Sequence, residues 1–219
     1  MRVVTPDFAH GYSGFCMLTD MIRFAAGLSL FASLTICSGL QASRLPDLQT
    51  AQPLKRADAP QLAPYVPTPQ DVVERMLALA GVTKNDYVID LGCGDGRIPV
   101  TAAKKYGARA FGVDIDPARI AEANANAKAA GVTQLVEFRL QDAMKTDVST
   151  ATVVTTYLLS ASNLRLRPIL TKQMKPGTRL VAHNFSFGDW APEKTDSFTD
   201  AEGRSRTLYL YRADGKVRQ

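Results

Sequence analysis

The chain has 219 residues, a formal net charge of +5 and a hydrophobic fraction of 46%. This length predicts one folded domain plus an additional segment, and the apolar fraction is ordinary for a soluble core. Three distant cysteines (Cys16, Cys37 and Cys93) and only two histidines indicate neither a disulfide framework nor a metal site. The basic charge permits an anionic partner such as RNA or lipid, although the absence of a long Lys/Arg run favours an ordinary basic surface.

Residues 1–42 form an N-terminal segment whose stretch 24–42 contains no charged side chain. Arg23 precedes this stretch and "GLQAS" ends it, which is typical of a secretory signal that begins at Met21 and is cleaved near Ala42. An uncleaved membrane anchor is the alternative, since the stretch is just long enough to span a bilayer. Arg44, Lys55 and Arg56 follow it and favour retention of the next domain in the cytoplasm. The sequence leaves both readings, and the true start, open.

A linker rich in Pro, Ala and Gln spans residues 43–61, and residues 62–219 form the predicted domain. We expect Thr68 to cap a first helix that has Pro69 as its first residue and ends at Gly81. Apolar patterning then predicts strands at 87–91, 109–115, 136–140, 151–159 and 178–184, helices at 98–106, 117–130 and 163–173, and a hairpin at 194–212. This alternation predicts an α/β fold with a doubly wound, mostly parallel sheet and a C-terminal antiparallel hairpin.

A glycine-rich turn, "DLGCGDG", follows the first predicted strand. Its GxGxG spacing differs from the GxGxxG pattern of nicotinamide-binding domains. Asp90 precedes Gly92 at the strand tip, where it could pair with the amino group of a cationic cofactor. Gly92, Cys93 and Gly94 would let the backbone pass close to that ligand. S-adenosylmethionine has such an amino group and no pyrophosphate, so we expect this cofactor here.

Two further acids follow the next two predicted strands. Asp114, with Ile115 beside it, is placed to accept hydrogen bonds from ribose hydroxyls. Asp142, with Ala143 beside it, could accept one from the adenine amino group. A nicotinamide-binding domain, or a relative of the fold without any cofactor, is the alternative for this pattern.

Three acids after three successive strands, with GxGxG after the first, resemble the class I S-adenosylmethionine-dependent methyltransferases. This resemblance covers residues 62–212 and implies a Rossmann-like sheet of seven strands. "PYVPTP", "DLGCGDGRI" and "KPGTRLVAHNFSFGDW" further resemble the ATP synthase c-subunit lysine methyltransferases and, more distantly, the Dot1-type lysine methyltransferases. Asp114 and Cys93 depart from the former, which tend to have Glu and Ser at these positions.

The resemblance implies a protein lysine as methyl acceptor, in a substrate embedded in or close to a membrane. The Asn/Asp-Pro-Pro-Tyr run of amide and nucleobase enzymes is absent after the strand at 151–159. Tyr157 is the acceptor-site candidate, with an ordinary strand aromatic as the alternative. Phe185, Phe187 and Trp190 could line a lysine channel or pack the hairpin, and we expect His183 to be a core residue with its hydrogen bonds satisfied.

RNA or small-molecule methylation and a non-catalytic cofactor-binding module remain alternatives, and the oligomeric state and any catalytic base stay open. Because the cofactor is made in the cytoplasm, we expect a membrane-associated protein with a cytoplasmic catalytic domain, and export is the alternative.

Overall fold

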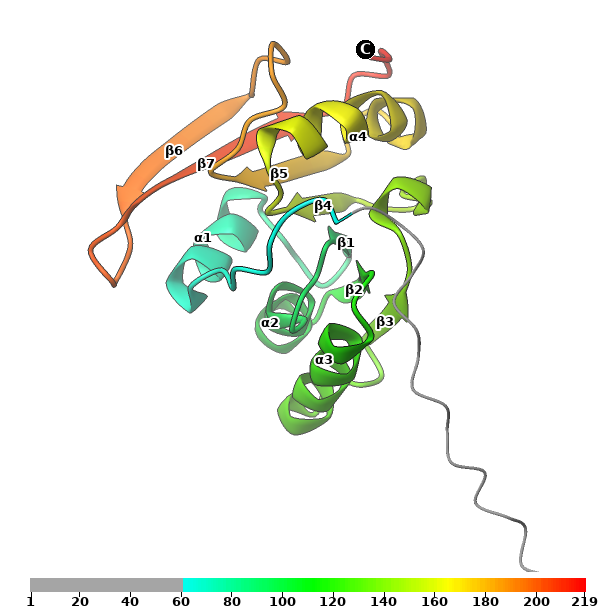
Figure 1. The fold of residues 1–219 in the computed structure, drawn as a ribbon, viewed down its shortest axis with the longest axis vertical. Coiled ribbons are helices and arrows are strands. Elements are labelled where there is room, and N and C mark those ends of the chain that lie inside the picture. Colours follow the sequence, from blue (N-terminus) through cyan, green and yellow to red (C-terminus); the bar gives the residue numbers. More distant parts are fainter. Residues whose placement is uncertain (1–60) are drawn as a thin grey trace, which may run out of the picture. The chain divides into compact units, whose positions relative to one another are not determined.

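Seven strands form one mixed sheet in the computed structural model, which describes residues 61–219 (Figure 1). The strands are β1 (Tyr87–Leu91), β2 (Arg109–Asp114), β3 (Val136–Leu140), β4 (Val153–Thr156), β5 (Arg179–His183), β6 (Lys194–Thr199) and β7 (Ser205–Arg212). Their order across the sheet is β3-β2-β1-β4-β5-β7-β6. Strands β1 to β5 are parallel, and β7 runs antiparallel to both of its neighbours. The predicted fold class and its C-terminal hairpin are confirmed.

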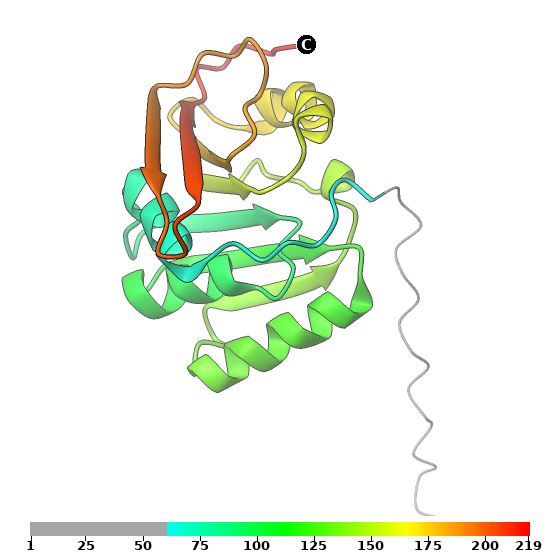
Figure 2. The ribbon, with the colours of Figure 1, turned by 60° about the vertical axis from the view of Figure 1, so that its left-hand side comes forward.

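Helices cover both faces of this sheet (Figures 1 and 2). They are α1 (Gln70–Leu79), α2 (Arg97–Tyr106), α3 (Pro117–Ala130), the short 3-10 helix η1 (Ala143–Lys145) and α4 (Ser160–Gln173). Residues of α1 and α2 share a core with Val88 of β1, whereas α4 packs on Ile89 and Leu91 of the same strand. Alternate residues of β1 therefore face opposite layers, and both faces are buried, which explains why its sequence is apolar apart from Asp90 near its carboxyl end.

Several helix and strand boundaries differ from the sequence prediction. Pro69 is the N-cap of α1 and no side chain caps this helix, so the prediction of Thr68 as cap is wrong. The Thr68 hydroxyl instead lies 3.4 Å from Nδ1 of His183. Strand β4 ends at Thr156, three residues before the predicted end, and α4 begins at Ser160, three residues before the predicted start. Beyond the end of the strand, Tyr157 and Leu158 line a pocket.

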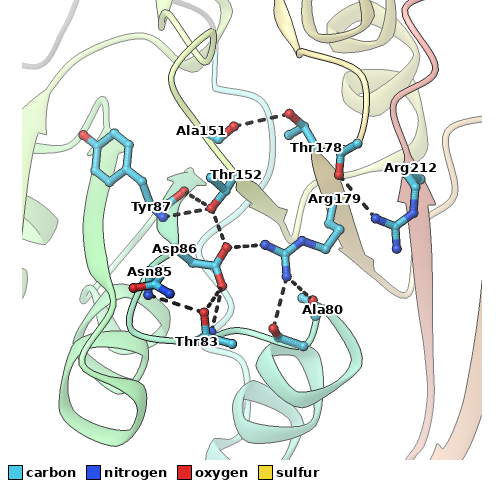
Figure 3. A network of polar contacts seen from close by, with 12 residues as sticks. Ala80, Thr83, Asn85, Asp86, Tyr87, Ala151, Thr152, Thr178, Arg179 and Arg212 are labelled. Atoms are coloured by element: carbon cyan, nitrogen blue, oxygen red, sulfur yellow. Dashed lines mark hydrogen bonds and ion pairs between the residues drawn. The ribbon is translucent and has the colours of Figure 1, made fainter.

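A polar network fastens the amino-terminal ends of the central strands to the end of α1 (Figure 3). Arg179 forms an ion pair with Asp86 and donates to the carbonyl oxygen of Ala80. Asp86 also accepts hydrogen bonds from Thr83 and Thr152. Burial would raise the pKa of Asp86, but these hydrogen bonds and the Arg179 charge outweigh it and hold the pKa below its usual value. The network lies at the edge opposite the pocket, so its role is structural.

Residues 24–42, predicted as signal or anchor, and the linker up to residue 60 lie outside the described residues. Within 61–219, none of the helices combines the length and hydropathy that crossing a bilayer requires.

Candidate functional site

One pocket opens at the carboxyl ends of β1, β2 and β4, where ligands bind in open α/β sheets. The structure brings all the residues predicted for the cofactor, together with the acceptor candidate Tyr157, to this pocket. They are Asp90, Gly92, Cys93, Gly94, Asp114, Ile115, Asp142, Ala143 and Tyr157. The predicted set is therefore one spatial site and not a scatter of similar motifs.

The glycine loop (residues 92–96) turns the chain from β1 into α2. Gly92, Gly94 and Gly96 have φ values of 80°, 52° and 75°, in the left-handed region that side chains disfavour. A Cβ on Gly94 would lie 2.5 Å from the Tyr65 ring, and one on Gly96 would lie 2.5 Å from the Phe138 ring. The loop needs glycine for its backbone conformation and because two aromatic rings press on it.

Cys93 lies inside this loop and is buried. Burial, with the nearby charges of Asp90 and Asp114 adding to it, raises the pKa of the Cys93 thiol well above its usual value. The thiol is therefore held in its protonated form, which is a poor nucleophile. Cys93 packs beneath the loop and is not placed for covalent chemistry.

Asp90 is the most deeply buried acid of the pocket, with 2% of its surface exposed. Burial raises its pKa to about 7, although the hydrogen bond from Thr155, 2.6 Å long, acts in the opposite direction. A cationic ligand group would supply the charge that this carboxylate lacks. The site thus suits the amino group of S-adenosylmethionine, as the sequence predicts.

Asp114 and Asp142 are both half-buried and both fix local backbone. Asp114 accepts hydrogen bonds from the amides of Gly94, at 3.0 Å, and Asp116, at 2.9 Å, so it ties the glycine loop to the end of β2. Asp142 accepts from the amide of Met144, at 2.9 Å, and caps η1. A carboxylate has about four lone-pair sites, so each acid retains acceptor capacity towards a ligand in the pocket.

An extended segment, the strap (residues 61–68), forms one side of the pocket and leads into α1 (Figure 2). Arg97 donates to the carbonyl oxygen of Thr68 at 2.7 Å and makes a bidentate pair with Asp95. Burial would raise the pKa of Asp95, but Arg97 outweighs it and holds the pKa below its usual value. The Arg119 guanidinium lies 4.4 Å from the centre of the Tyr65 ring. The strap is therefore attached to the glycine loop, α2 and α3.

Sequence reasoning misses the strap residues and the acids and arginines that hold them. "PYVPTP" stands out only through a family resemblance, because an extended Pro-rich segment has no periodicity to mark it. Asp95, Arg97 and Arg119 line the pocket as well. The spacing Asp-x-Arg in "GDGRI" is the available signal, since it places Asp95 just before the N-cap of α2 and Arg97 at its first residue.

Aromatic rings gather beside the pocket at the carboxyl ends of β4 and β5. The Tyr157 ring centre lies 3.9 Å from that of His183 and 6.3 Å from that of Phe185. Asn184 between them has a φ of 61°, and the Phe185 amide donates to the His183 carbonyl oxygen at 2.7 Å, which forms a tight γ-turn. This strained turn places the rings of His183 and Phe185, on either side of Asn184, near Tyr157.

The other two aromatics of the "FSFGDW" stretch lie elsewhere. Phe187 and Trp190 are buried and pack on Tyr211 of β7, with ring centres 5.5 and 4.7 Å from it. Phe187 and Trp190 therefore do not line a lysine channel beside Tyr157. For these two residues the alternative, packing against the hairpin, is confirmed. His183 is buried as expected, but its Nε2 has no hydrogen-bond partner among the described residues, so it is not a satisfied histidine.

The pocket is acidic overall. Five aspartates line it against two arginines, Arg97 and Arg119, and each arginine is already paired with a carboxylate of the chain. The described lining contains no histidine, lysine or glutamate. This distribution favours positively charged ligands over polyanions.

Comparisons with known proteins agree with this geometry. The sequence matches the ANTKMT methyltransferase domain over residues 90–194. It is 47% identical over 149 residues to a protein-lysine N-methyltransferase of Saccharolobus islandicus, covering 68% of this chain and 92% of the relative. It is 28% identical over 130 residues to the human lysine N-methyltransferase of the ATP synthase c-subunit, which covers 59% of this chain and 55% of that protein.

A crystal structure of an RNA methyltransferase from Salinibacter ruber in complex with S-adenosyl-L-homocysteine superposes with a TM-score of 0.66. It is 49% identical, and the match covers 70% of this chain and 97% of that one. The fold, the glycine loop and the three acids together define a seven-stranded methyltransferase whose cofactor is S-adenosylmethionine. Within that class, the chain belongs to the family of the ANTKMT methyltransferase domain and the S. islandicus enzyme.

Proposed function

We propose that this methyltransferase modifies the ε-amino group of a lysine in a protein substrate. The observation that supports this most strongly is the 47% identity to the S. islandicus protein-lysine N-methyltransferase, of which the match covers 92%. The pocket agrees with this acceptor, because both arginines of the described lining are already paired and are not free to bind the phosphates of RNA. The names of the S. islandicus and human relatives support the same acceptor.

We assign the pocket residues to cofactor binding by their contacts. Asp90 would hold the amino group, Asp114 the ribose and Asp142 the adenine edge, while Gly92 and Gly94 let the backbone approach. When bound, S-adenosylmethionine supplies a methyl group that is already activated by the positive sulfur. The main task of the protein is then to align the acceptor with that methyl group.

The acceptor side requires a neutral amine, because an ammonium group has no lone pair for the attack. The lysine pKa of about 10.4 in water opposes this. Tyr157 and Phe185 would form an acceptor wall that excludes water and disfavours the ammonium form. Since no histidine or lysine lines the described pocket, the proton would leave to solvent before transfer. The rate should therefore rise with pH below the pKa of the acceptor.

RNA is the second candidate acceptor, since the S. ruber protein, at 49% identity, bears the name of an RNA methyltransferase. The two acceptors are separated by one experiment. Extracts of cells that lack the gene are incubated with the full-length protein and methyl-labelled S-adenosylmethionine, and the labelled products are then digested with either RNase or protease. Label that survives RNase and is found on lysine by mass spectrometry supports the proposal. Label that survives only protease replaces lysine by RNA.

We further propose that the substrate is membrane-embedded or membrane-proximal and that the catalytic domain works on the cytoplasmic side. The support is the uncharged stretch 24–42, the human relative's name and the cytoplasmic origin of the cofactor. An alkaline phosphatase fused after Gln219 tests the topology. An inactive fusion with labelled membrane proteins agrees with the proposal, whereas an active fusion shows export and contradicts it.

A further inference from the structure

A buried imidazole connects the pocket to the interior at the end of β5. His183 has no exposed surface, and its ring packs on Tyr157 with 3.9 Å between centres and 30° between planes. Tyr157 in turn lines the cofactor pocket. The position of the Tyr157 ring therefore depends on a side chain that itself touches neither the pocket nor solvent.

The strap contacts the same imidazole through Thr68. Thr68, the last residue of the strap, is buried, and its hydroxyl lies 3.4 Å from Nδ1 of His183. The carbonyl oxygen of Thr68 accepts a hydrogen bond from Arg97, which belongs to the cofactor pocket. One strap residue thus joins the cofactor side of the site to His183, and His183 joins it to Tyr157.

Packing alone does not explain a polar ring at position 183. Nε2 of His183 is buried and has no hydrogen-bond partner in the described part of the chain, and a phenylalanine would avoid leaving this polar atom unpaired. Burial, together with the nearby charge of Arg206, lowers the pKa of His183 to about 4, although Asp200 acts in the opposite direction. The imidazole is therefore neutral near pH 7 and too weak a base to take a proton from a lysine. Its polar function is the contact with Thr68.

We propose that His183 is a positioning residue for methyl transfer: anchored by Thr68 of the strap, it fixes the ring of Tyr157 at the acceptor side of the pocket. Because the strap lines the cofactor pocket and holds His183 through Thr68, a cofactor bound against the strap also orders the acceptor wall and so prepares the site for the acceptor. This inference rests on the proposed placement of Tyr157 at the acceptor.

The test uses the full-length protein and four variants. Thr68→Val and His183→Phe remove the polar contact and keep the shape, Thr68→Ser keeps the hydroxyl, and Thr178→Val is a matched control in another buried threonine at the opposite end of β5. We expect the first two to lower kcat/KM for the acceptor about tenfold or more. Their Kd for S-adenosylmethionine should stay within about twofold, because the Thr68 carbonyl contact to Arg97 remains. Thr68→Ser and Thr178→Val should behave like the wild type.

Two further measurements isolate the coupling. The double variant Thr68→Val/His183→Phe should lose no more activity than the less active single variant, because both changes break one contact. Hydrogen exchange gives a readout that needs no acceptor. Cofactor binding should protect amides 183–187 in the wild type and in Thr68→Ser but not in Thr68→Val, although these residues do not line the pocket.

Additive losses in the double variant, a loss confined to cofactor affinity, or equal protection in Thr68→Val and the wild type would each overturn the inference. Failure of the lysine proposal is a separate result. In that case wild-type protein labels the RNA fraction, and the same variants are compared on that fraction. If His183→Phe does not fold, the comparison of Thr68→Val with Thr68→Ser and the exchange measurement still decide the question.

Discussion

Cofactor binding should become weaker as the pH falls below 7, because Asp90 must lose its proton to pair with the amino group. Burial raises the pKa of free Asp90 to about 7, with the charges of Asp114 and Asp95 adding to the effect and Thr155 opposing it. If only ionised Asp90 binds, the apparent Kd scales as one plus ten raised to the difference between pKa and pH. Between pH 7 and pH 5.5 the Kd then rises about sixteenfold. The cofactor amino group stays protonated over this range, so the slope reports on Asp90.

Isothermal titration calorimetry in buffers of different ionisation enthalpy measures both the Kd and the proton released. At pH 6 we expect about 0.9 proton released per cofactor bound, since about one free protein in eleven is already ionised. Asp90→Asn should bind more weakly and remove both the slope and the proton release. Thr155→Val removes a hydrogen bond that lowers the Asp90 pKa, so it should move the slope to higher pH. Glu137→Gln, an exposed acid on β3, is the control.

The stability of the cofactor-free protein should show the opposite trend. The pKa of Asp90 in the folded state exceeds the value of about 3.9 of an unfolded chain, so its stabilising effect is complete below pH 4. That effect is lost as the pH rises towards 7. The Tm should fall over this window in the wild type and fall less in Asp90→Asn. A pH-independent Kd in the wild type, or an unchanged slope in Asp90→Asn, would refute the assignment of Asp90.

Three other changes test the remaining parts of the site and fold. Gly94→Ala should destabilise the protein by about 1–2 kcal/mol in thermal unfolding, because its φ is 52° and its Cβ meets Tyr65, and Gly94→Arg should abolish cofactor binding in calorimetry. Asp114→Ala should weaken cofactor binding by about 1–3 kcal/mol through lost hydrogen bonds to the ligand and to the glycine loop, and unchanged affinity would remove it from the site. Arg179→Ala should cost about 3 kcal/mol in chemical denaturation, because it leaves the Asp86 carboxylate buried and unpaired, yet leave the Kd for the cofactor unchanged. A large change in that Kd would show that the network of Figure 3 does influence the site.

The sequence alone is sufficient to predict the sheet and the cofactor side of the pocket. Parallel strands end at one edge of the sheet, so acids such as Asp90 and Asp114 at their carboxyl ends must lie together once the fold is known. Glycines and helix ends punctuate the chain clearly, which is why the prediction of α3 at Pro117–Ala130 is confirmed at both ends. These features depend on local chain patterns and one rule of topology.

The acceptor side cannot be predicted in the same way, because it depends on contacts between distant segments. Thr68 has the sequence of a helix cap, since Ser or Thr before Pro is a common helix start. The competing contact with His183, 115 positions later, has no local signature. His183 itself has the pattern of an ordinary core residue because its strand is apolar on both sides. Only the fold reveals that the two meet beside Tyr157 and leave Nε2 without a partner among the described residues.

This difference has a consequence for how substrate choice can vary in such a domain. The cofactor side is built from strand tips and the glycine loop, which the fold fixes, so few changes are tolerated there. The acceptor side is built from the strap, the γ-turn at Asn184 and the early end of β4, none of which the parallel core requires. Relatives with similar identity can therefore bear names as different as lysine and RNA methyltransferase. The residues that decide the acceptor should be sought at Thr68, Tyr157 and the segment from His183 to Phe185, and not in the motif that identifies the family.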